Sequence, residues 1–168
     1  MTLYTEYLSE SMLNLNTPKT LRSTIMSSAL YNTPQEAETA FYHAFERADI
    51  DLMSSVWAHI DGIECVHPLS DRLSGNKDVL ESWRSMFQQP PGLSIKIEAQ
   101  QCVTSSTLAV HIVDEHITMM EGDNMQQSVI HATNVYQLID SNWQMVVHHA
   151  SPSRRPQQKQ SIRSESIH

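Results

Sequence analysis

The stretch LAVHIVDEHITMMEGDNMQQSVIHATNVYQLIDSNWQMVVHHA, residues 108–150, decides the fold. It contains three long runs with alternating apolar and polar residues, separated by short polar turns at residues 121–124 and 140–142. Period-two alternation between tight turns is typical of antiparallel β-hairpins. The sequence therefore predicts consecutive strands at residues 108–119, 125–139 and 143–150.

The chain before this stretch predicts another strand preceded by helices. Residues 93–98 alternate in the same way, whereas upstream the apolar period is 3.6. Thr33-Pro34-Gln35-Glu36 is a helix start, and its helix has an apolar stripe at Ala37, Ala40, Phe41, Ala44, Phe45 and Ala48. A short helix capped by Asp49 and a third capped by Asn76 are also expected. Helices followed by a sheet predict an α+β fold.

A short strand is predicted between the second and third helices. The run Ile63 to His67 is mainly apolar, and Pro68 ends it because proline cannot donate to a strand ladder. The strand end therefore presents His67, a titratable side chain, beside a polar loop.

Composition excludes several classes of protein. The 168-residue chain has a net charge of −8, with 16 acidic and 5 basic residues between residues 33 and 150. This acidity argues against a nucleic-acid partner, and no apolar run is long enough to cross a membrane. Cys65 and Cys102 lie far apart in apolar runs, so buried free thiols and a cytoplasmic location are expected. No glycine-rich phosphate loop or other cofactor motif occurs.

Three segments are predicted from these patterns. Residues 1–32 are expected to be an N-terminal appendage, residues 33–152 a single domain, and residues 153–168 a disordered basic tail.

Several short motifs together resemble the SnoaL-like branch of the nuclear transport factor two-like superfamily, which includes ketosteroid isomerases. They are the proline-started helix ending in Ala48-Asp49-Ile50-Asp51, Trp57, Cys65-Val66-His67-Pro68, Gly75 before Ser82-Trp83, Ala132-Thr133-Asn134-Val135-Tyr136, and Trp143 to Pro152. The resemblance covers residues 33–152. It implies a strongly curved antiparallel sheet wrapped around helices as a cone with a deep pocket, a cystatin-like α+β roll, found usually in dimers.

The resemblance also implies roles for particular residues. In ketosteroid isomerases an aspartate before proline is the general base, and His67 occupies that position here. The two groups that hold the oxyanion in those enzymes correspond to Asn134 and Phe41. His67 and Asn134 are therefore the predicted catalytic pair, while Phe41 departs from the pattern and counts against steroid isomerase activity.

The strand register gives a separate prediction of which residues line the pocket. A turn at Gly122-Asp123 places His111 opposite Asn134 and Glu115 opposite Ile130, and a turn at Ser141-Asn142 places His149 opposite Asn134 and Val147 opposite Tyr136. The pocket face then carries His111, Glu115, Asn134, Tyr136, Val147 and His149, and the other face carries Asp114, His116, His131 and His148. The helices add Phe41, Phe45, Trp57, Trp83 and Phe87 as ligand-binding candidates.

More than one interpretation of these residues stays open. His67 could be a general base or a strand-end histidine bonded to the backbone. His111 and His149 with Glu115 could bind a metal, but no compact ligand spacing occurs, so no metal is predicted. The chain is expected to bind a small apolar or amphipathic molecule, and the alternative is an isomerase, cyclase or hydratase using His67. A homodimer through the outer face, which bears Ile112, Val129, Val135 and Val146, is also expected, with His131 near Asp114 at the contact.

Overall fold

The computed structural model describes residues 31–88, 92–121, 124–154 and 158–161. The chain divides into two units, Met1–Leu30 and Tyr31–His168, and every described residue belongs to the second. The predicted N-terminal appendage therefore lies almost wholly outside the described residues.

Helix α2 (Pro34–Arg47) begins as its sequence predicts. The Thr33 hydroxyl accepts a hydrogen bond from Glu36 N at 3.2 Å, and the Glu36 carboxylate in turn accepts one from Asn32 N at 2.7 Å. This reciprocal arrangement satisfies amide groups that have no partner within the helix. The helix ends at Ala48, whose left-handed backbone (φ 53°) turns the chain into α3 (Ile50–Val56), capped by Asp49.

Helix α4 (Asn76–Phe87) differs at its start from the sequence prediction. Gly75 rather than Asn76 is the N-cap, and its φ of 85° is a conformation that glycine adopts readily. The Asn76 amide instead donates to the Ala58 carbonyl oxygen at 3.0 Å. This hydrogen bond joins the start of α4 to the residues that follow α3.

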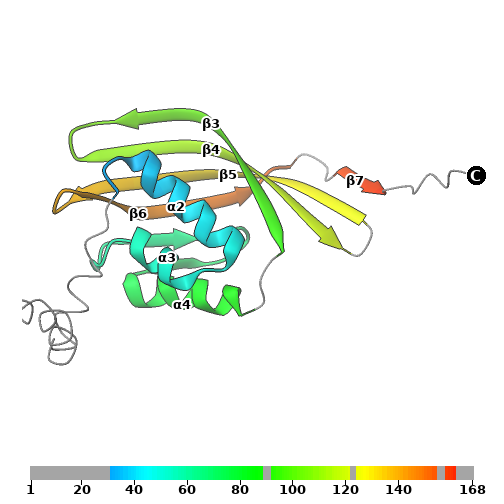
Figure 1. Ribbon diagram of the computed structural model, residues 1–168, viewed down its shortest axis with the longest axis horizontal. Coiled ribbons are helices and arrows are strands. Elements are labelled where there is room, and N and C mark those ends of the chain that lie inside the picture. Colours follow the sequence, from blue (N-terminus) through cyan, green and yellow to red (C-terminus); the bar gives the residue numbers. More distant parts are fainter. Residues whose placement is uncertain (1–30, 89–91, 122–123, 155–157, 162–168) are drawn as a thin grey trace, which may run out of the picture. The chain divides into compact units, whose positions relative to one another are not determined.

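The sheet has the order β2-β1-β6-β5-β4-β3 (Figure 1). Its strands are β1 (Glu64–Val66), β2 (Arg72–Ser74), β3 (Leu93–Thr104), β4 (Leu108–Glu121), β5 (Asn124–Ile139) and β6 (Asn142–Pro152). Neighbouring strands run antiparallel except β1 and β6, which pair in parallel. The β4–β5 register is the predicted one, with His111 opposite Asn134 and Glu115 opposite Ile130.

The β5–β6 register differs from the prediction, and this changes which histidine faces inward. The two-residue turn is Asp140-Ser141, with φ values of 49° and 64°, rather than Ser141-Asn142. This change alone shifts the register by two residues and keeps every face. A β-bulge at Val146, between the pairs Tyr136–Met145 and Val135–Val147, inserts one extra residue into β6. Beyond it the net shift from the predicted register is one residue, so the faces are reversed.

Three predictions on β6 are wrong as a result of this bulge. His148, not His149, lies opposite Asn134, so His148 is buried and His149 is exposed. Val147 pairs with Val135 rather than Tyr136, whereas Val146, predicted on the outer face, joins the core.

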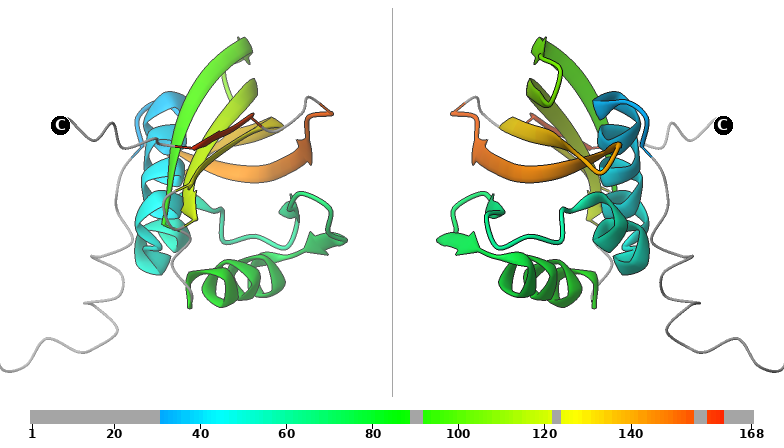
Figure 2. Two further views of the ribbon diagram at one scale, coloured as in Figure 1. Left: turned by 90° about the vertical axis from the view of Figure 1, so that its right-hand side faces the viewer. Right: turned by 90° about the vertical axis from the view of Figure 1, so that its left-hand side faces the viewer.

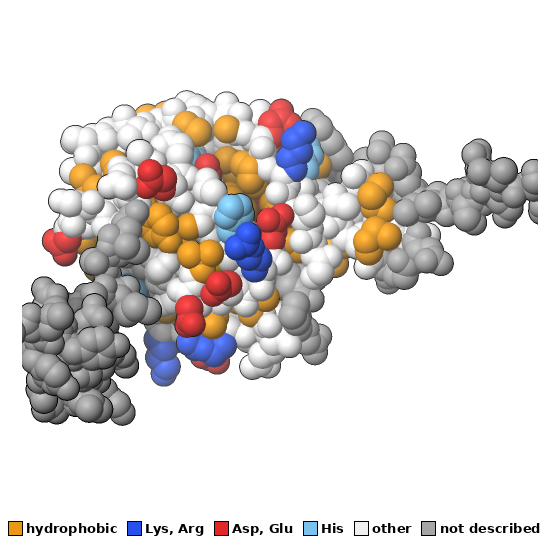
Figure 3. All heavy atoms as spheres, viewed as in Figure 1, with side chains coloured by type: hydrophobic (Ala, Val, Ile, Leu, Met, Phe, Trp, Pro, Cys, Tyr) orange, Lys and Arg blue, Asp and Glu red, His pale blue; other side chains and the backbone are white. Residues whose placement is uncertain are grey.

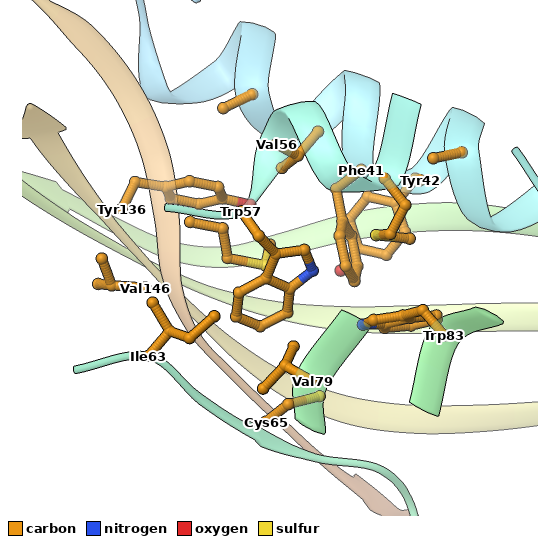
Figure 4. Packing of buried hydrophobic residues seen from close by; sticks show 14 of the residues in the cluster. Phe41, Tyr42, Val56, Trp57, Ile63, Cys65, Val79, Trp83, Tyr136 and Val146 are labelled. Carbon is orange, nitrogen blue, oxygen red and sulfur yellow. The ribbon is translucent and has the colours of Figure 1, made fainter. Parts of the chain in front are cut away.

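The core lies between the bent sheet and the three helices of the described residues (Figure 2). Figure 4 shows Trp57 and Trp83 on either side of Phe41, with Val56, Val79 and Ile63 packed around them. Cys65 also lies in this core, whereas Cys102 is exposed, contrary to the expectation that both thiols are buried. Apolar residues from helices and strands thus form one core.

Residues near the C-terminus form a strand that the sequence did not predict. Strand β7 (Gln158–Ser161) pairs antiparallel with the first residues of β5, from Asn124 to Gln127. These four residues lie in the segment for which the sequence predicts a disordered tail, and the rest of the segment beyond Arg154 lies outside the described residues. Among the helices described, none is long and apolar enough to cross a membrane.

Candidate functional site

His67 follows the last residue of β1, and its side chain packs against helix α4. Its ring packs edge-on against Trp83, with centroids 4.7 Å apart, and its Nε2 lies 3.0 Å from Ser82 Oγ. The Ser82 hydroxyl donates its own proton to the Val79 carbonyl oxygen at 2.7 Å. Ser82 Oγ is therefore the acceptor for His67 Nε2–H, which leaves Nδ1 as the basic nitrogen of the neutral ring. Burial lowers the His67 pKa.

Asn134 is fully buried and holds together a network of polar side chains. Its Oδ1 lies 2.7 Å from His148 Nδ1, and its amide donates to the Tyr42 hydroxyl at 2.9 Å and to Glu38 Oε1 at 3.3 Å. Both amide hydrogens are thus engaged, and no hydrogen bond joins Asn134 to His67 among the described residues. His67 and Asn134, the predicted catalytic pair, are therefore connected indirectly: His148 bonds to Asn134, and the rings of His148 and His67 both lie near that of Trp83.

His148 lies between the two members of that pair. Because the Asn134 amide donates elsewhere, its Oδ1 accepts from His148 Nδ1–H, and His148 Nε2 carries the lone pair. The ring lies 5.0 Å from the Phe41 ring and 6.2 Å from that of Trp83. Burial, and then the charges of His67 and His149, lower the His148 pKa to about 3, so this ring is neutral.

Glu115 is a buried carboxyl group at the other end of the network. The Tyr42 hydroxyl donates to its Oε1 at 2.9 Å. Burial raises the Glu115 pKa to about 7, the Tyr42 hydrogen bond opposes this shift, and the charge of Glu38 adds to it. The group therefore exchanges its proton near neutral pH, which suits acid–base chemistry.

His111 and Tyr136 carry buried polar atoms without a hydrogen bond. Their rings lie 5.1 Å apart. His111 Nδ1 is 3.1 Å from Glu38 Oε2 but is not aligned for a hydrogen bond, and His111 Nε2 has no partner among the described residues. The Tyr136 hydroxyl meets no well-aligned acceptor there, although Glu38 is near enough for a hydrogen bond with it to contribute to the raised Tyr136 pKa. Burial and the charge of Glu38 raise the Tyr136 pKa.

The predicted aromatic residues form a continuous cluster inside the molecule. Phe45 lies 5.1 Å from Trp83 and 6.4 Å from Phe87, and Phe41 lies 5.4 Å from Trp83 and 6.4 Å from Trp57 by ring centroids. The indole Nε1 atoms of Trp57 and Trp83 are buried without an acceptor. A buried unsatisfied donor costs about 1–3 kcal/mol, so these two groups need a partner that the described chain does not supply.

The sequence prediction missed four members of this site: Glu38, Tyr42, Ser82 and His148. Glu38 and Tyr42 are four residues apart on α2, beside the apolar stripe rather than within it, so they share one helix face. That spacing could have indicated them. The hydroxyl near Asn134 comes from Tyr42, the residue next to the predicted counterpart Phe41.

A surface groove lies away from these residues. It is lined by Tyr31, Gln35, Glu36, Thr39, Ala40, His43 and Leu52, with a volume of about 490 Å³. None of the predicted site residues lines it. In Figure 3 hydrophobic side chains emerge between α2 and α3, and a separate group lies at the far ends of β4 and β5. No group of three or more metal-binding side chains occurs in the described part of the chain.

Comparisons with known proteins identify the family. The SnoaL-like domain model matches residues 35–154. A crystal structure from Thiobacillus denitrificans, described as a calcium/calmodulin-dependent protein kinase type II association domain, is 38% identical, with a TM-score of 0.70 over 76% of this chain and 100% of that one. A Streptomyces avermitilis structure, described as a dehydratase of the NTF2-like family, is 25% identical, with a TM-score of 0.65 over 83% and 100%.

Two further comparisons extend the range of relatives. A ketosteroid isomerase-like protein from Erwinia carotovora atroseptica shares the fold, with a TM-score of 0.57 and 19% identity over 73% of this chain and 94% of that one. The F-box protein SKIP8 of Arabidopsis thaliana is 24% identical over 67% of this chain, which spans 46% of that protein. Since the family model matches most of its length, the chain belongs to the SnoaL-like family, within the NTF2-like superfamily.

Proposed function

We propose that this protein binds a small, largely apolar molecule between its bent sheet and its helices. The observation that carries the proposal is a set of buried nitrogens that have no hydrogen-bond partner among the described residues: Nε1 of Trp57, Nε1 of Trp83 and Nε2 of His111. Native proteins satisfy nearly all such atoms. Their position among aromatic rings is the composition of a ligand site: mainly apolar, with a few polar groups.

A second candidate function is acid–base catalysis on such a ligand. His67 favours it, because its lowered pKa keeps the ring neutral at pH 7 and its Nδ1 is the free basic nitrogen. The description of the Streptomyces relative as a dehydratase agrees with this chemistry. His67 would accept a proton from the substrate, and His148 Nε2 offers a second neutral acceptor near the same ring of Trp83.

Binding and turnover can be separated in one experiment. Enones, epoxides and hydroxylated polyketides would be titrated into wild type and His67→Ala, with His59→Ala, an exposed histidine, as the matched control. A catalytic His67 predicts that turnover falls about 100-fold or more in His67→Ala and is unchanged in His59→Ala. Binding without turnover in all three proteins supports the non-catalytic function. Failure of every compound to bind would remove the proposal.

The outer face of the sheet supports a homodimer as a further proposal. It exposes Ile112 and carries contacts of His131 Nδ1 with Asp114 Oδ1, at 2.6 Å, and of His116 Nε2 with Glu98 Oε2, at 3.2 Å. An exposed apolar face is a frequent site of association. The Thiobacillus relative is described as an association domain, which agrees with this proposal. The free thiols Cys65 and Cys102 support a cytoplasmic location.

A further inference from the structure

Strand β5 is longer than the strand that lies beside it. Its partner β6 pairs with the residues from Ile130 to Ile139, so the first residues of β5 extend beyond β6. Strand β7 pairs antiparallel with four of them, from Asn124 to Gln127 (Figure 1). Between the two pairings, the Ser153 N–H donates to the Val129 carbonyl oxygen at 2.9 Å. Strand β7 therefore covers an edge of β5 that would otherwise present unpaired backbone groups.

The sequence of β7 does not match the surface beside it. That sequence is Gln-Lys-Gln-Ser, which contains no apolar residue. In the register of the pair, Gln160 stands opposite Met125, which in turn stands opposite Met120 of β4. Met125 is half-buried and Met120 is 54% exposed. Cross-strand partners share a face of the sheet, so a glutamine occupies the position next to a pair of methionines.

A strand of this length and composition gains little from its pairing. A backbone hydrogen bond contributes only about 1 kcal/mol net, because it replaces hydrogen bonds with water. Each residue that becomes ordered costs about 1–2 kcal/mol of backbone entropy. An apolar cross-strand pair would add about 0.2–1 kcal/mol, but the pair of Gln160 with Met125 is not one. These terms nearly cancel over four residues, which makes the pairing of β7 with β5 weak.

We propose that β7 is a replaceable occupant of this edge, and that the edge binds an extended segment of another protein with an apolar residue opposite Met125. Strand addition is a general mode of peptide recognition, in which backbone hydrogen bonds give affinity and alternate side chains give specificity. Methionine suits this role, because its flexible side chain adapts to apolar residues of different shapes. A second copy of this chain would offer only the sequence of the β7 already tethered there, at an effective concentration of about 1 mM or more.

The test opens the edge in the whole 168-residue chain and offers it two peptides. Adjacent residues of a strand direct their N–H groups to opposite sides, so the double variant Lys159→Pro, Gln160→Pro removes a donor to β5. The matched control is Ser164→Pro, Glu165→Pro, beyond the last residue of β7. The probes are synthetic peptides of residues 154–163, one with the sequence of the chain and one with isoleucine in place of Gln160. Shifts of the amide NMR signals of residues 124–127 locate and quantify binding.

The double-proline variant in β7 should bind the isoleucine peptide about 2- to 5-fold more tightly than the glutamine peptide, because one apolar cross-strand pair is gained. Wild type and the control should bind both peptides about 10-fold more weakly, since β7 then leaves the edge open in about one molecule of ten. Adding Met125→Thr to the double-proline variant should abolish the preference for isoleucine. Adding Met119→Thr should preserve it, because Met119 is exposed on the same hairpin but points to the other face.

Several results would overturn the proposal and leave ligand binding between the sheet and the helices untouched. They are the absence of shifts at residues 124–127 in the double-proline variant, equal affinity of that variant and wild type, and a preference for isoleucine that survives Met125→Thr. Self-association of the double-proline variant through this edge, seen by light scattering, would make a second copy the occupant instead. Gln160→Ile in the otherwise unchanged chain gives a measurement that does not depend on the prolines. It should slow hydrogen exchange of the β7 amides about 2- to 5-fold, and an unchanged rate would refute the apolar match.

Discussion

Replacement of Glu115 by glutamine should change how stability depends on pH. The Glu115 side chain is buried, accepts a hydrogen bond from Tyr42 and lies in the field of Glu38, with His111 on the same strand. Its pKa is raised from 4.5 to about 7. Glutamine has nearly the same shape and keeps an oxygen for Tyr42, but it cannot ionise.

The sign of the effect follows from proton binding in the two states. Between pH 4.5 and 7 the folded state keeps the Glu115 proton, whereas the unfolded chain has lost it. Stability therefore falls as pH rises through this window, and the contribution is complete only below pH 4.5. The shift of 7 − 4.5 = 2.5 units corresponds to about 3 kcal/mol, at about 1.4 kcal/mol per unit.

Wild type alone would hide this effect, because His148 acts in the opposite direction. Its pKa is lowered from 6.5 to about 3, so its contribution is lost as pH falls through that window. The two slopes cancel between about pH 4.5 and 6.5. The quantity to measure is therefore the difference in free energy of unfolding between wild type and Glu115→Gln.

Urea unfolding followed by tryptophan fluorescence gives that difference at each pH from 4 to 8. The free energy of unfolding of wild type minus that of Glu115→Gln should fall by about 3 kcal/mol as the pH rises from 4 to 8, because only wild type loses the contribution of the protonated carboxyl group. Glu81→Gln is the control, because Glu81 is exposed beside Arg84 and its difference should vary by no more than about 0.5 kcal/mol. A Glu115→Gln difference that does not change with pH would refute the reasoning, and would mean that Glu115 ionises as it does in the unfolded chain.

Three further predictions follow from local features of the fold. Thr33→Ala should lower the free energy of unfolding by about 1 kcal/mol, measured in urea, because the N-cap hydrogen bond to Glu36 is lost; an unchanged midpoint would contradict this. Gly75→Ala should lower the free energy of unfolding by about 1–2 kcal/mol, because alanine is strained at a φ of 85°. Gly62→Ala is the control for the same urea measurement and should be nearly neutral, because Gly62 has open space around it and no positive φ. If the outer face forms a homodimer, light scattering at micromolar concentration should give twice the 19.1 kDa chain mass for wild type and the single mass for Ile112→Glu; a monomeric wild type would exclude the dimer.

The local elements of this fold were predictable because neighbouring residues specify them. The Thr33 cap, the stripe of α2 and the pairing of β4 with β5 each depend on contacts within a few residues or across one hairpin. The predicted turn of two residues is enough to set the β4–β5 register that the structure shows, and so the prediction placed His111 and Glu115 on the same face as Asn134. Phe41, Phe45, Trp83 and Phe87 were predicted because the helical period places them on the apolar faces of α2 and α4, whereas Tyr42, beside that stripe, was missed.

The site itself depended on the tertiary structure. The Val146 bulge has no signal in the alternation of residues, because Met145, Val146 and Val147 are all apolar, and it alone exchanges His148 for His149. The parallel pairing of β1 with β6 then brings Cys65 opposite His148, and it brings His67 near Trp83, whose ring also lies near that of His148. The sequence by itself determined the helices α2, α3 and α4, the strands β1 and β3 to β6, and most of the buried aromatic residues, but not the short strands β2 and β7. Only the packing of α2 against the sheet decided that Glu38 and Tyr42 reach Asn134, because contacts between residues more than 90 positions apart leave no periodic pattern in the chain.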